Sequence, residues 1–218
     1  MTNRTRLIAA LTAGVLAVPV AAIGAPKQLS ANDKPQVSGP LSTTPSLQGC
    51  KKKTQRHEGE AIARFHICNG YYVFNPDEET NGTTDYGAYW VQTTVDAVNG
   101  WCTRSVTTEL TGSTGITKRA LKPGTTIKAN KGRKVTTKIK VDAQGDTDSP
   151  GTLKNTFRLR PGTLKSRRQG SKFSMIWTGK SQAKLAFVMG AEIRWTTGDS
   201  PPTFTPQLFA RFEKRNDC

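Results

Sequence analysis

Two stretches decide the fold that this chain is expected to adopt: Val135-Thr136-Thr137-Lys138-Ile139-Lys140-Val141 and Leu153-Lys154-Asn155-Thr156-Phe157-Arg158-Leu159. In both, the large apolar side chains fall on alternate positions, and lysine or arginine occupies most of the positions between them. A strand directs successive side chains to opposite faces. The alternation therefore predicts antiparallel strands with one buried and one solvent-facing surface.

The same period of two recurs along the chain. Phe173–Trp177 and Ala191–Thr196 alternate in this way, which predicts an outward position for Glu192. The threonine-rich segments 86–98 and 101–110 also suit strands, and Asn99-Gly100 between them predicts a hairpin turn. Residues 58–65 fit either one helical turn or the edge of a strand.

Many short strands separated by Gly and Pro turns are typical of all-β folds. We expect a single antiparallel β-sandwich with two disulfides, and a β-barrel is the alternative.

The first 24 residues have the pattern of a secretory signal peptide. Arg4 and Arg6 precede an uncharged stretch, Leu7–Ala25, which ends in small residues. We expect cleavage between residues 22 and 25, and a secreted, extracellular mature protein with no membrane-spanning segment. A retained membrane anchor is the alternative, although the stretch is rich in alanine and is interrupted by proline and glycine.

The rest of the chain divides into a linker and one domain. Residues 25–48 are rich in Pro, Ser, Thr and Gln, so we expect a flexible linker. Residues 49–218 have the length of one domain. The formal charge is +16, and it falls to +14 when residues 1–24, which hold two arginines and no acid, are removed.

Four cysteines follow the signal: Cys50, Cys68, Cys102 and Cys218. An even number of cysteines in an exported chain predicts disulfides. We expect Cys50–Cys68 with Cys102–Cys218, and the alternative is Cys50–Cys218 with Cys68–Cys102. No C-x-x-C pair is present, so we predict no zinc site.

The outward positions of the two opening stretches and their flanks carry a set of cations: Lys134, Lys138, Lys140, Lys154, Arg158 and Arg160. If the two strands pair, these six cations share one face of a sheet, where like charges placed opposite each other are destabilising. A polyanion would relieve that repulsion, and the positive field would speed its capture. The alternative is that the cations only solubilise the protein and protect a sheet edge.

These patterns predict a basic, non-enzymatic secreted protein that associates with an anionic extracellular polymer, lipid or cell surface. No specific nucleic-acid binding is expected, because stacking platforms need exposed aromatics, and Phe157 is directed inward. We predict no cofactor. A structural envelope protein or a protein-binding module is a further alternative.

Two other residue sets define alternatives. His57 and His66 lie near Glu58 and Glu60, and histidines can transfer protons in a small basic secreted hydrolase such as a ribonuclease. The other set consists of carboxylates that could bind calcium: Asp142, Asp146 and Asp148. This loop does not match a D-x-D-x-D-G pattern, so we expect no metal there.

The signal hypothesis makes a prediction about the N-terminus. The protein recovered from culture medium should begin at residue 23 or 25, because the small residues Ala22 and Gly24 precede these positions. N-terminal sequencing checks this. Replacing Arg4 and Arg6 with glutamate should abolish export. Wild-type protein that stays bound to the cells and still contains the uncleaved segment with Arg4 and Arg6 would contradict the hypothesis.

Overall fold

The computed structural model describes residues 7–11, 35–39, 41–74, 84–112, 122–141, 151–169 and 172–214. These residues form strands joined by turns and loops, and the described part of the chain contains no helix that could span a bilayer. The strands are β1 (Leu7–Leu11), β2 (Gln36–Ser38), β3 (Leu47–His57), β4 (Glu60–Val73), β5 (Thr84–Ala97), β6 (Trp101–Gly112), β7 (Ile127–Ala129), β8 (Arg133–Val141), β9 (Gly151–Leu159), β10 (Gly162–Gln169), β11 (Lys172–Ser181), β12 (Leu185–Thr196) and β13 (Phe204–Lys214).

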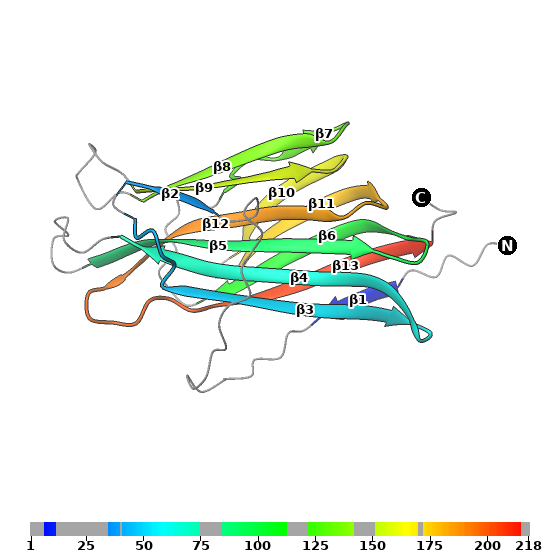
Figure 1. The fold of residues 1–218 in the computed structure, drawn as a ribbon, viewed down its shortest axis with the longest axis horizontal. Helices are drawn as coiled ribbons and strands as arrows, with labels where there is room; N and C mark the ends of the chain where they lie inside the picture. The colour runs from blue at the N-terminus through cyan, green and yellow to red at the C-terminus, as the bar shows by residue number, and fades with distance from the viewer. Residues whose placement is uncertain are drawn as a thin grey trace.

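The strands build three antiparallel sheets (Figure 1). The first has the order β1-β13-β6-β11-β10-β7, the second β12-β5-β4-β3, and the third β2-β9-β8. Each sheet is open, with two edge strands among the described residues. The predicted all-β, antiparallel class is therefore confirmed, and the alternative of a closed β-barrel is wrong.

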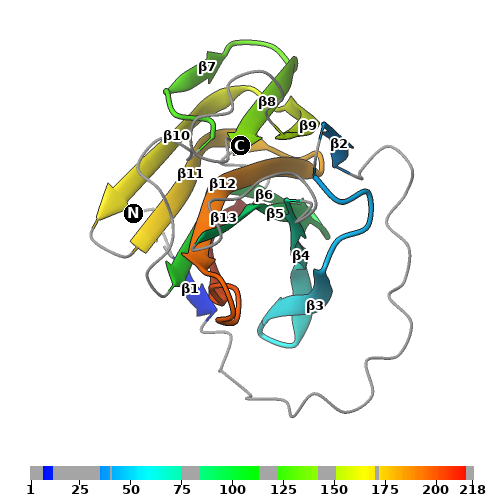
Figure 2. The same ribbon diagram turned by 90° about the vertical axis from the view of Figure 1, so that its left-hand side faces the viewer.

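The β12 and β5 side of the four-stranded sheet lies between the other two sheets, whereas β3 and β4 extend away from the β2-β9-β8 sheet (Figure 2). On one face, the Tyr89 ring of β5 packs against Phe204 of β13 with 4.6 Å between the ring centroids. On the opposite face, Ile139 of β8 packs on Gly190 of β12. The buried apolar side chains of all three sheets form one continuous core. As a result, β12 and most of β5 are buried on both faces.

Burial of both faces of β12 overturns one expectation. The alternation in Ala191–Thr196 predicts an outward Glu192, whereas the Glu192 side chain is only 6% exposed. Its Oε1 accepts hydrogen bonds from Nε and Nη2 of Arg194, each at 2.9 Å. A buried carboxylate needs such a partner, because burial without one carries a large desolvation penalty.

The Asn99-Gly100 turn is present, but the predicted hairpin is wrong. Asn99 and Gly100 have φ angles of 53° and 75°, and Trp101 N–H donates to Val98 O at 3.1 Å. The turn leads from β5 in the four-stranded sheet to β6 in the six-stranded sheet. Both strands already have partners on each side, so the turn joins two layers and not two paired strands.

The β3–β4 hairpin lies where the sequence allowed a helical turn or a strand edge. Glu58 and Gly59 form its two-residue turn with φ angles of 49° and 83°. Arg56 Nη1 donates to Gly59 O at 2.7 Å, which ties the turn to β3. Glu-Gly is a weaker turn signal than Asn-Gly, because Glu is less tolerant of the left-handed region.

Parts of the N-terminal region contribute strands. Leu7–Leu11, within the predicted signal, forms β1 along the edge of β13, and removal of residues 1–24 stays a prediction. In the segment expected to be a linker, Gln36–Ser38 pairs with β9, and Leu41 is buried in the core. The role of residues 25–48 as a linker stays a prediction.

The contact of Ile139 with Gly190 makes a prediction about stability. A Cβ at residue 190 would overlap Ile139 Cδ1, so Gly190→Ala should destabilise the protein by about 1–3 kcal/mol through overpacking. Ile139→Val removes that methyl group, so the double variant should lose less than the sum of the single variants. Urea unfolding measures both effects.

Gly49 provides the control for this experiment. A Cβ there would meet only Asn69 Oδ1 at 3.9 Å, so Gly49→Ala should be neutral or mildly stabilising. Strict additivity of the Gly190 and Ile139 substitutions would contradict the packing argument.

Candidate functional site

The alternating stretches 135–141 and 153–159 pair as neighbouring strands. β8 and β9 run antiparallel, with Lys134 opposite Arg158 and Lys138 opposite Lys154. Lys140 lies on the same face, opposite Thr152. We call the surface made by these five exposed cations the basic face.

The opposite side of this ladder anchors it to the protein. Val135, Ile139, Leu153 and Leu159 are buried, which directs the residues between them to solvent. The hydroxyls of Thr136 and Thr156 lie 3.2 Å apart, between the two pairs of opposed cations. The positions of the cations are therefore fixed by core packing from the other side of the sheet.

The cations of the basic face are not neutralised by acids in the described residues. The ion pairs of lysine or arginine found there involve Arg104, Lys172 and Arg194, none of which lies on the basic face. Like charges placed directly opposite each other cost roughly 0.2–1 kcal/mol per pair in a sheet, and salt screens this cost. The two opposed pairs therefore weaken the free protein, and more so at low salt.

Arg160 differs from the other five predicted cations. It follows the end of β9, is half-buried, and its Nε donates to Lys184 O at 3.1 Å. That bond directs its guanidinium toward the loop before β12. Arg160 thus lies at the margin of the basic face.

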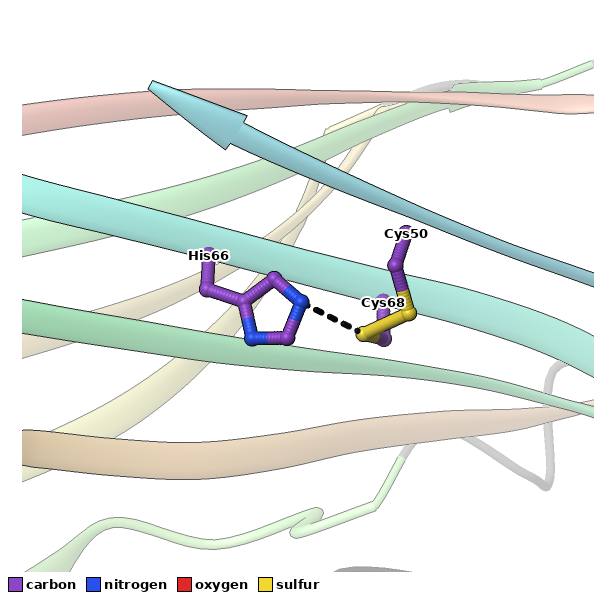
Figure 3. Close-up of a disulfide and its surroundings, with 3 residues drawn as sticks. All are labelled: Cys50, His66 and Cys68. Carbon is purple, nitrogen blue, oxygen red and sulfur yellow. Dashed lines mark hydrogen bonds between the residues drawn. A yellow bond between two sulfur atoms is a disulfide. The ribbon is translucent and has the colours of Figure 1, made fainter. Parts of the chain in front are cut away.

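The Cys50–Cys68 disulfide joins directly opposed residues of β3 and β4, which confirms the expected pairing and excludes its alternative (Figure 3). It closes a separation of 18 residues, which stabilises the fold by about 3 kcal/mol in the chain-entropy account. His66 Nε2 lies 3.2 Å from Cys68 Sγ. The three side chains could gather around a metal ion, but the bridge leaves no thiolate to bind one.

Cys102 is buried in β6, and none of the cysteines in the described part of the chain is free. Its expected partner Cys218 lies outside the described residues, so this second bridge stays a prediction. Asp142, Asp146 and Asp148 also lie outside the described residues.

The two candidate catalytic histidines do not converge. His57 pairs with Glu60 at the hairpin end, and His66 pairs with Lys52. Six residues of β4 separate these positions, which is about 20 Å of strand. His57 packs edge-on against Trp101 at 5.5 Å between the ring centroids. This geometry does not favour a mechanism in which both imidazoles act on one bond.

Three tyrosines have perturbed acidity. Burial raises the pKa of Tyr71, Tyr72 and Tyr89. For Tyr89 this effect outweighs the hydrogen bond from Asn69 Nδ2, which is 3.0 Å long and lowers the pKa. These phenols stay protonated at neutral pH, so they offer no general base there.

A second basic surface was missed by the sequence reasoning. A groove of about 860 Å³ on the six-stranded sheet is lined by four cations from four strands: Arg104, Lys128, Lys180 and Arg211. Arg104 Nε is neutralised by Glu213 at 3.1 Å. No run or alternation in the sequence indicates this groove, because each strand contributes a single cation to it.

No protein-family model, curated protein or solved structure matches this chain.

The opposed cations make a prediction about stability. Lys138→Glu converts a repulsive pair with Lys154 into an attractive one, so the free energy of unfolding should rise by roughly 0.5–1 kcal/mol at low salt. Thermal unfolding at low and high salt measures the gain and its screening.

Lys140→Glu is the matched control, because it changes the same charge on the same strand but lies opposite Thr152. Its effect should be smaller. Equal gains for both variants would show that net charge, and not direct opposition, determines the stability.

Proposed function

We propose that this protein associates with an anionic extracellular polymer through the basic face. The observation that carries the proposal is the direct opposition of Lys134 with Arg158 and of Lys138 with Lys154, with no acidic partner in the described residues. Solubility alone does not require cations to be opposed in this way. A bound polyanion turns the repulsion into attraction.

The geometry of the sheet suits a linear polymer. Alternate residues on one face of a strand are about 6.7 Å apart, and neighbouring strands are about 4.8 Å apart. A flexible chain with one anion per repeat can therefore contact several of these cations at once. Such contacts are electrostatic and exposed, so salt should weaken them strongly.

The proposal also places the protein outside the cell. Residues 1–24 are removed on export, and a Cys102–Cys218 bridge ties the C-terminus to β6. Outside the cell, wall polymers and lipid headgroups present the anions that the basic face would contact. The separation of His57 from His66 makes the alternative, a ribonuclease-like hydrolase, less favoured.

A retention experiment tests this function. The protein should bind phosphocellulose at about 50 mM salt and elute well below about 1 M. A triple variant with Lys134, Lys138 and Lys154 changed to glutamine should bind about 100-fold more weakly at low salt. This magnitude assumes about 1 kcal/mol for each cation near an anionic surface.

The matched control changes Lys51, Lys52 and Lys53 to glutamine, which removes the same charge from β3. It should retain most of the binding. Equal losses in the two triple variants would show attraction by net charge alone, and wild-type retention that ignores salt would refute the proposal.

A further inference from the structure

A cleft of about 250 Å³ lies between β9 and β12, with β5 contributing to its lining. β2 pairs with β9 only at Thr152–Lys154, so it does not cover the later part of β9. We call this the edge cleft. It lies next to the basic face but is lined largely by other residues.

Two buried polar atoms in the edge cleft have no hydrogen-bond partner among the residues that the structure describes. Asn155, on the inward face of β9, is 3% exposed, and its Nδ2 donates to no acceptor. Gln92 Oε1 from β5 accepts no hydrogen bond. Buried polar groups in folded proteins are nearly always paired, so an unpaired donor and acceptor in one cleft indicate a missing ligand.

Cations surround the same space. The lining includes Arg158, Arg160 and Lys184. The Nε of Arg160 is held by Lys184 O, which fixes the guanidinium and leaves its terminal nitrogens to donate to an anion. Lys184 is exposed in the loop just before β12, where its ammonium can reach a ligand at the rim.

The remaining lining is apolar. Phe157, Ala186 and Val188 provide carbon surface. A small-molecule site typically combines such a surface with a few fixed polar groups. The volume is below the roughly 300–1,000 Å³ of drug-sized pockets, so the cleft fits one compact unit.

We propose that the edge cleft binds a single acidic sugar unit. The anionic group contacts Arg158, Arg160 and Lys184, and the carbon face of the ring packs on the apolar lining. A ring hydroxyl donates to Gln92 Oε1, and Asn155 Nδ2 donates to a ring or hydroxyl oxygen.

Each simpler ligand leaves part of the cleft unmatched. An inorganic anion has too few donors for Gln92 Oε1 and no carbon face for the apolar lining. A neutral sugar leaves three cations without an anion. The edge cleft shares only Arg158 with the basic face, so this inference does not depend on polymer binding there.

Isothermal titration of the full chain tests the proposal with four probes: glucuronate, glucose 6-phosphate, glucose and inorganic phosphate. At least one acidic sugar should bind with a Kd on the order of 1 mM, a value expected for a ligand of this size. Glucuronate and the sugar phosphate distinguish a carboxylate from a phosphate as the anion. Glucose and inorganic phosphate should each bind at least tenfold more weakly.

Asn155→Leu separates a binding role from a structural one. It removes an unpaired donor, so the melting temperature should hold or rise while the affinity falls at least tenfold. Thr137→Val is the matched control, because Thr137 lies opposite Asn155 on β8 and also has an unpartnered buried hydroxyl, yet it does not line the cleft. Its Kd should equal that of the wild type.

Lys184→Gln changes an exposed side chain and provides a second test. It should weaken binding of the acidic sugar several-fold, and the protein should still fold. Lys134→Gln with Lys138→Gln should leave this Kd unchanged, which keeps the test separate from that of the basic face. Equal binding of glucose, inorganic phosphate and the acidic sugars, or an unchanged Kd in Asn155→Leu, would overturn the proposal.

Discussion

Burial of β12 on both faces, together with most of β5, is the constraint on which the rest of the structure depends. Gly190 lets Ile139 approach the β12 backbone, and the β2-β9-β8 sheet packs there as a third layer. Two consequences follow from that contact. Glu192 needs Arg194 as a partner, and the alternation of β8 and β9 is fixed with the apolar side inward and the basic face outward.

Both proposed surfaces depend on β9. Its outward residues supply Lys154 and Arg158 to the basic face, and its inward residues place Asn155 in the edge cleft. The short strand β2 covers only Thr152–Lys154, so the later part of β9 can border the cleft. One strand can thus serve two kinds of anion recognition, because its two faces meet different surroundings.

The protein keeps unfavourable features beside these surfaces. The opposed cations repel one another, and Asn155 and Gln92 have unpartnered polar atoms in a packed region. The continuous core and the Cys50–Cys68 bridge offset these costs. Such groups weaken the free fold because their hydrogen bonds or counter-charges are missing. A ligand that supplies these interactions gains binding free energy from them.

The sequence by itself determined the alternation within each strand, and hence which cations of 134–141 and 153–159 point away from the core, and it determined the turn at Asn99-Gly100, because these follow from local backbone geometry. The pairing that places Lys134 opposite Arg158 and Lys138 opposite Lys154 belongs to the tertiary structure. Tertiary structure alone decided that this turn joins two sheets, that Glu192 is buried, and that Gln92 and Asn155 meet across a cleft. Period-two alternation indicates which residues share a face of a strand. It does not indicate whether one face or both faces pack against another sheet. Coverage depends on contacts between residues far apart in the chain, such as Ile139 and Gly190.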